Sequence, residues 1–149
     1  MLTVVATEEE IKLIEKGSKY IVTGVGAVNV FNALKDVDRD EMIYNIGYAG
    51  SNIIPIGSKV RIGKVCNYHP NANFTEPEYD LGGDVICYSS TDFVLKTEIK
   101  EPCVFDMELV YILAMGFENV VSDKIISDNL DLNEYNDMVY GDLNGKTEN

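Results

Sequence analysis

The chain is poor in the residues that bind phosphate groups and metal ions. Its 149 residues include only two arginines, Arg39 and Arg61, and one histidine, His69, which is followed by Pro70. Asp and Glu together number 25 against 12 Lys and Arg, so the formal net charge is −13. An anionic surface repels nucleic-acid phosphates, which argues against DNA or RNA as a partner. One histidine offers little for a zinc site, so we expect no metal and no cofactor.

Cysteines are few, and long apolar runs are absent. Cys66, Cys87 and Cys103 are odd in number and have no CxxC spacing, a pattern typical of buried free thiols in a cytosolic protein. No apolar run approaches the roughly 20 residues that a membrane-spanning helix needs. The N-terminus also lacks the basic and then apolar segments of a secretory signal. We therefore expect a cytoplasmic protein without a membrane partner.

Apolar segments with strand and helix patterns alternate along the chain. The strand patterns cover residues 2–6, 19–23, 41–47, 59–68, 84–90, 102–106 and 119–127, and the helix patterns cover residues 8–16, 27–37 and 109–117. This alternation predicts an α/β fold, with a single-domain mixed β-sheet flanked by helices. We divide the chain into a compact domain of residues 1–130 and an acidic tail of residues 131–149, whose weak pattern is typical of partial disorder.

Polar residues follow several of these strands at the point where each strand ends. Glu10 follows the first strand, Asp106 and Glu108 follow the strand at 102–106, and Asp128 follows the last. Helix capping and the helix dipole explain each carboxylate singly. In α/β sheets, however, ligands bind outside the carboxyl ends of the strands. Capping does not predict that carboxylates from three strand ends gather at one edge of the sheet.

Six segments occur in the same order as the signature segments of a known family. They are "VVATEEEI", "TGVGAVNVFNAL", "NIGYAGS", "SSTDFV", "VFDMELVYI" and "KIISDN". The chain resembles the nucleoside phosphorylase family, and within it most resembles the 5′-methylthioadenosine/S-adenosylhomocysteine nucleosidases, in a shortened form. The resemblance covers most of residues 1–130, and "DMEL" with "ISDN" is its strongest pair of segments. It implies a nucleoside phosphorylase-like fold.

The resemblance also implies a role for each matching residue. Asp128 matches the aspartate that protonates the purine at N7, and Glu10 matches the glutamate that helps to activate water. Met107 would pack on the ribose, while Glu108 would accept hydrogen bonds from its hydroxyl groups. These residue types suit N-glycosidic cleavage, in which positive charge develops on the ribose and negative charge on the departing base.

The base and the rest of the site are matched in the same way. Phe93 would stack on the base, and Val94 would offer backbone hydrogen bonds to its edge. Further residues expected to line the site are Gly26, Tyr48, Ala49 and Gly50. The chain differs from the family in having Lys124 in place of an arginine. The helix that follows "ISDN" is expected to be shortened or missing.

The expected activity is hydrolysis of a purine nucleoside or 5′-thionucleoside at its N-glycosidic bond. A phosphorylase needs groups that hold phosphate, usually arginine, whereas this chain has "TEEE" after its first strand. Three alternatives stay open, and two of them are a non-catalytic nucleoside- or base-binding domain and a nucleoside phosphorylase. A purely structural acidic protein is a third. The expected partner is a small-molecule nucleoside, and a homodimer is the assembly to test.

Overall fold

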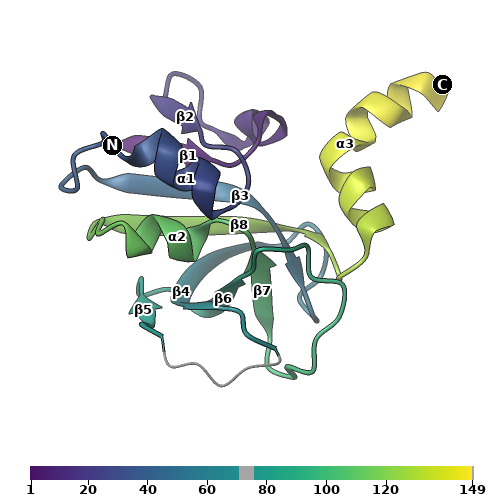
Figure 1. Cartoon of the computed structure of the whole chain (residues 1–149). Helices are drawn as coiled ribbons and strands as arrows, with labels where there is room; N and C mark the ends of the chain where they lie inside the picture. The colour runs from purple at the N-terminus through teal and green to yellow at the C-terminus, as the bar shows by residue number, and fades with distance from the viewer. Residues whose placement is uncertain (71–75, 149) are drawn as a thin grey trace.

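A computed structural model describes residues 1–70 and 76–148 of the chain. Within them the sheet strands are β1 (Leu2–Val5), β2 (Tyr20–Val22), β3 (Ile43–Ser51), β4 (Lys59–Asn67), β5 (Tyr79–Asp80), β6 (Val85–Ser89), β7 (Cys103–Asp106) and β8 (Val120–Asp128). The helices are the short 3₁₀ helix η1 (Glu8–Leu13), α1 (Ala27–Leu34), α2 (Leu109–Ala114) and α3 (Leu132–Glu148). Figure 1 shows how they are arranged.

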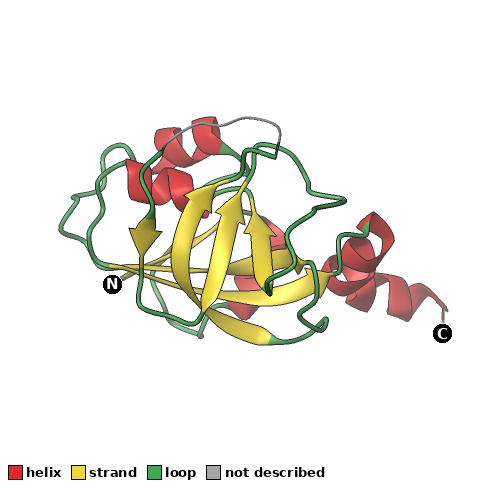
Figure 2. Cartoon of the chain, turned by 90° about the horizontal axis from the view of Figure 1, so that it is seen from below, coloured by secondary structure: helices red, strands yellow, loops and turns green. Residues whose placement is uncertain are grey.

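The strands form one mixed sheet that closes on itself. Strand β3 pairs in parallel with β8 and antiparallel with β7. Strand β4 pairs antiparallel with β8 and in parallel with β6, and β6 pairs in parallel with β7. These pairings close a ring through β3, β8, β4, β6 and β7, while β1 and β2 extend the sheet beyond β3 (Figure 2). The predicted α/β class with a mixed sheet is confirmed.

The core lies between the ring and helices α1 and α2. Helix α2 buries four apolar side chains within six residues, Leu109, Val110, Ile112 and Leu113. They belong to a cluster of buried apolar side chains from the strands and from α1, which includes Ile62 of β4 and Val104 of β7. Burying side chains of this size contributes roughly 1.5–3 kcal/mol each. The cluster therefore holds β7, and the α2 turn that follows it, against the sheet.

Four segments differ from the sequence-based expectation, and one of them is β5, which no strand pattern predicted. The first helix is a 3₁₀ helix that ends at Leu13 rather than at residue 16, and β3 continues to Ser51 rather than ending at residue 47. Residues 132–148 form α3 where we expected a partly disordered tail and a shortened or missing helix. Val139 of α3 is buried, and Lys12 Nζ of η1 donates a hydrogen bond to its carbonyl oxygen at 3.0 Å. Tertiary contacts thus stabilise a helix that its weak pattern did not predict.

The division of the chain at residue 130 stays a prediction.

No helix among residues 1–70 and 76–148 is long and apolar enough to cross a membrane. Cys66, Cys87 and Cys103 are free thiols, of which Cys87 and Cys103 are buried and Cys66 is partly exposed.

Candidate active site

The ends of three strands meet at Gly50 of β3. Gly50 pairs with Phe105 of β7 and with Asp128 of β8. The register between β3 and β8 shifts there, because Ala49 pairs with Ile126 and leaves one extra residue, Ser127, on β8. Bulges of this kind redirect side chains near active sites. A Cβ atom at Gly50 would lie only 2.9 Å from Asp128 Oδ2, so glycine makes room for this carboxyl group.

A cleft opens at this meeting point. It has about 450 Å³ of empty space, part of it open to solvent. The four predicted catalytic and ribose-binding residues line it, together with Phe93 and the β3 segment 48–50. An adjoining hollow of about 230 Å³ shares six of these lining residues and adds Val94. Gly26 lines neither space. It precedes α1 with φ +92°, a conformation that favours glycine.

Glu10 is buried and points back from η1 toward the strand ends. Its Oε1 accepts hydrogen bonds from the N–H groups of Ala6 at 2.8 Å and Thr7 at 3.1 Å. Its Oε2 accepts one from Tyr48 N at 2.8 Å. A Cβ atom at Gly47 would come within 2.5 Å of Oε2. The backbone of β1, η1 and β3 therefore fixes this carboxylate in one orientation.

Asp128, at the end of β8, is also fully buried. Its Oδ1 lies 2.5 Å from Ser127 Oγ, and its Oδ2 accepts hydrogen bonds from Leu130 N at 3.0 Å and Asp131 N at 3.3 Å. Leu130 adopts φ +62°, a left-handed conformation that is rare for a residue with a side chain. Burial raises the pKa of Asp128, and the hydrogen bonds from Ser127 and the backbone oppose the rise.

Glu108 belongs to a buried group of three charges. Its Oε1 accepts a hydrogen bond from Lys124 Nζ at 2.7 Å, and Nζ also lies 3.1 Å from Asp106 Oδ2. Burial raises the pKa of Glu108 to about 7, the Asp106 charge adds to the rise, and Lys124 opposes it. For Lys124, burial alone would lower the pKa, but the two carboxylates outweigh burial and raise it.

Asp106 has the structural role that capping predicted, and more. Its Oδ2 accepts a hydrogen bond from the N–H of Leu109 at the start of α2 at 2.9 Å. Its Oδ1 accepts one from Ser89 Oγ at 2.5 Å, and Ser89 Oγ in turn accepts one from Val110 N. The Asp106 carboxylate therefore caps the start of α2 and, through its contact with Lys124, also belongs to the buried group of three charges.

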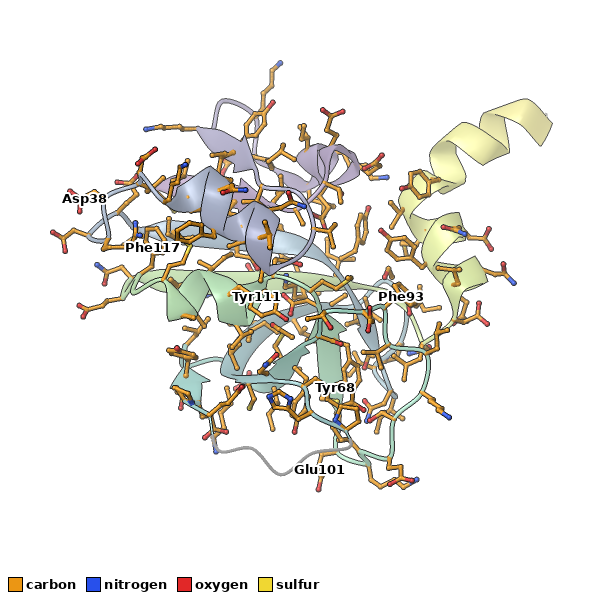
Figure 3. The ribbon with its side chains drawn as sticks, viewed as in Figure 1. Asp38, Tyr68, Phe93, Glu101, Tyr111 and Phe117 are labelled. Atoms are coloured by element: carbon orange, nitrogen blue, oxygen red, sulfur yellow. The ribbon has the colours of Figure 1, made fainter. Side chains whose placement is uncertain are left out.

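Aromatic side chains form the outer wall of the cleft. Phe93 makes an edge-to-face contact with Tyr135 of α3, with ring centroids 5.3 Å apart. Figure 3 shows Phe93 on the side of the molecule that faces α3. Lys12 Nζ, which binds the α3 backbone, lies 5.7 Å from the centre of the Tyr48 ring. Sequence reasoning missed Tyr135, whose only signal is an apolar side chain four residues before Val139.

Both arginines lie elsewhere. Arg39 donates hydrogen bonds to the carbonyl groups of Met115 at 2.8 Å and Val37 at 2.6 Å, and its guanidinium covers the Phe117 ring. Arg61 pairs with Asp123. Neither lines the cleft. Among the residues that the structure describes, no group of three or more His, Cys, Asp and Glu side chains is arranged to hold a metal ion.

Comparison with solved structures places the fold in a known class. The chain has the nucleoside phosphorylase-like fold of several solved nucleosidases. One is an MTAN of Chlamydia trachomatis, with TM-score 0.73 and 17% identity, over 95% of this chain and 87% of that one. Another is the 5′-methylthioadenosine/S-adenosylhomocysteine nucleosidase of Neisseria meningitidis in complex with methylthio-immucillin-A, with TM-score 0.71 and 16% identity, over 93% and 90% of the two chains.

A third similar structure is the futalosine hydrolase of Helicobacter pylori, with TM-score 0.71 and 14% identity, over 94% of this chain and 90% of that one. No protein-family model matches the chain, and no curated protein matches it by sequence. The similarity therefore concerns the fold.

Proposed function

We propose that the protein is an N-ribosyl hydrolase that cleaves the N-glycosidic bond of a purine nucleoside or 5′-thionucleoside. The observation that carries this proposal is the convergence of Glu10, Glu108 and Asp128, from three separate segments, on one cleft. All three carboxyl groups are buried, and their surroundings differ. Carboxyl groups in different environments are the usual means of dividing acid and base roles in one site.

Asp128 is the proposed general acid, which protonates the departing purine. A general acid must carry its proton when the substrate is bound, and burial raises the pKa of Asp128 in that direction. Oδ2 already accepts two backbone hydrogen bonds, which occupy both of its lone pairs. The proton is therefore expected on Oδ1, next to Ser127 Oγ.

Glu108 is the proposed acceptor for the ribose hydroxyl groups. A carboxylate offers about four lone-pair positions. Lys124 Nζ occupies one on Oε1, and Met107 N occupies one on Oε2 at 3.2 Å. One position remains on each oxygen, which suits two neighbouring hydroxyl groups. An anion beside the sugar also stabilises the positive charge that develops there in the transition state.

Glu10 is the proposed residue that orients the attacking water. Three of its four lone-pair positions accept backbone N–H groups, and the remaining one is on Oε2. A carboxylate fixed at both oxygens presents that last position in a constant direction. Such orientation is a large part of what an enzyme supplies to a reaction between two molecules.

Hydrolysis is favoured over phosphorolysis by the charges around the cleft. Its carboxylates would repel phosphate, and both arginines are engaged elsewhere with backbone carbonyl groups or with Asp123. Lys124 lies fully buried between two carboxylates. Water, by contrast, needs only an acceptor to orient it.

Incubation with a panel of purine nucleosides and 5′-thionucleosides, with and without phosphate, tests the proposal by chromatography of the released base. We expect base release that does not depend on phosphate. Base release that requires phosphate and yields ribose 1-phosphate would identify a phosphorylase. Tight binding without release, seen by calorimetry, would identify a binding domain.

A further inference from the structure

Lys124 is an unusual feature of this fold because its ammonium group is entirely buried. None of its side chain is exposed to solvent, and the carboxyl groups that it contacts, on Asp106 and Glu108, are at most 5% exposed. The idealised cost of moving an ammonium ion out of water is large, and is offset only when the ion is well paired. Two carboxylates share this one ammonium, so the group carries a net negative charge when all three are ionised.

We infer that Lys124 is a positioning residue that favours the ionised form of Glu108 and aims it into the cleft, with Asp106 holding the ammonium group between the two carboxylates. The assignment of Glu108 to the ribose rests on the proposed function. The effect of Lys124 on the charge of Glu108 does not, because it follows from the contacts alone.

The geometry gives Lys124 this role. Its Nζ lies 2.7 Å from Glu108 Oε1, which is the length of a strong charge-assisted hydrogen bond. The same Nζ lies 3.1 Å from Asp106 Oδ2, and Asp106 is itself fixed by the start of α2 and by Ser89. The ammonium group is therefore anchored on one side and orients the ribose carboxylate on the other.

The charged groups around Glu108 come from several elements, and they act in opposite directions. Lys124 on β8 favours the ionised form of Glu108, whereas Asp106 on β7 and Glu10 on η1 disfavour it. Cys87 on β6, whose thiol contacts Asp106, has its pKa raised by burial and so adds no charge at neutral pH. Lys124 is thus the one cation among these groups.

Removing Lys124 should raise the pKa of Glu108, and removing the charge of Asp106 should lower it. Without Lys124, burial and the two remaining carboxylates act unopposed, so the pKa of Glu108 rises above about 7 and the group is protonated at neutral pH. Without the charge of Asp106, the pKa falls. An opposite charge at this distance typically shifts a carboxyl pKa by roughly 1–3 pH units.

The first arm of the test is NMR titration of side-chain ¹³C-labelled glutamate, with Glu108 assigned by the signal that Glu108→Gln removes. Wild type is compared with Lys124→Met, Lys124→Arg, Asp106→Asn and the control Asp123→Asn. We expect the pKa of Glu108 to rise in Lys124→Met, to fall in Asp106→Asn, and to stay near the wild-type value in the other two. If Lys124→Met does not fold, the pKa of Glu108 measured in Asp106→Asn and in Lys124→Arg still tests the inference. An unchanged pKa in Asp106→Asn, or a shift toward higher pH, would overturn the inference.

The second arm is calorimetry with adenosine and with free adenine, in an Asp128→Asn background that prevents turnover. At pH 7 the Lys124→Met variant should bind adenosine roughly tenfold or more weakly than the protein with Lys124. The reason is that a protonated Glu108 no longer acts as a charged acceptor for two hydrogen bonds from the ribose. Adenine binding should be nearly unchanged, and Lys124→Arg should restore adenosine binding. If wild type binds neither probe, the proposed function fails, while the NMR arm still decides the role of Lys124. Equal loss of adenosine and adenine binding would contradict an effect directed at the ribose.

Discussion

Two neighbouring residues of β8 make ion pairs in different surroundings. Asp123 pairs with Arg61, whose side chain is 56% exposed, and accepts a further hydrogen bond from Tyr44 Oη at 2.6 Å. Lys124, the next residue, pairs with two buried carboxylates. Successive residues of a strand point to opposite faces, so one strand carries an inner group of three charges beside the cleft and an outer pair whose arginine reaches the surface, although Asp123 itself is only 6% exposed.

The pKa values show how these surroundings differ. For Asp123, partial burial alone would raise the pKa, but hydrogen bonds from Arg61 and Tyr44 outweigh it and lower the pKa. The outer carboxylate is therefore ionised at neutral pH. For Glu108, burial keeps the pKa near 7 in spite of Lys124. The inner carboxylate is thus close to its titration point, and a change in one neighbour can alter its charge.

The largest expected effect on stability follows from breaking the inner group. Lys124→Met leaves two buried carboxylates without a cation, which should cost roughly 3–5 kcal/mol of unfolding free energy. The matched outer change, Arg61→Met, removes a half-exposed partner but leaves Asp123, which is 6% exposed, with Tyr44 as a remaining hydrogen-bond donor, so it should cost less, roughly 1–3 kcal/mol. Urea denaturation of both variants measures the difference. Equal losses would mean that the inner group is no more important to the fold than the outer pair.

A glycine substitution tests how closely the backbone approaches the inner carboxyl groups. Gly50→Ala places a Cβ atom 2.9 Å from Asp128 Oδ2, so the carboxyl group must shift. Displacing a reacting group by about 1 Å can cost up to about 10²-fold in rate, so we expect a loss of roughly tenfold to 10²-fold in kcat. Gly141→Ala in α3 is the control, since a Cβ atom there meets nothing within 4 Å. A wild-type kcat in Gly50→Ala would show that the cleft tolerates this displacement.

The smallest expected effect concerns the aromatic wall. Stacking of a base on an aromatic side chain is worth roughly 1–3 kcal/mol, so Phe93→Ala should weaken nucleoside binding by that amount. Phe31→Ala on α1 is the control, because Phe31 is 55% exposed and does not line the cleft. Calorimetry measures both affinities. Unchanged affinity in a folded Phe93→Ala variant would remove Phe93 from the site.

Much of this arrangement could be predicted from local sequence patterns. The apolar strands followed by carboxylates predicted the α/β class and the gathering of Glu10, Glu108 and Asp128, because residues at the ends of neighbouring strands meet at one edge of a sheet.

The remaining features depend on contacts between distant segments. Closure of the sheet requires β4 to pair with both β6 and β8, and no local pattern records such pairings. Lysine is among the residue types that are least often buried, so the buried position of Lys124 emerges only with Asp106 and Glu108 beside it. Helix α3 is stabilised by Lys12, more than 100 residues earlier in the chain, and Tyr135 therefore escaped prediction.

The central claim is that Asp128 protonates the departing base, and base release by three proteins tests it most directly. Wild type, Asp128→Asn and Asp123→Asn are assayed in parallel in phosphate-free buffer, with the substrate that the nucleoside panel selects. Asparagine keeps the shape of Asp128 but has no proton to deliver, and general acid catalysis is typically worth about 10²–10⁴-fold. We predict a loss of that size in Asp128→Asn, with nucleoside binding retained, and a nearly wild-type rate in Asp123→Asn. Full turnover by Asp128→Asn, or no base release by wild type with any nucleoside, would contradict the account.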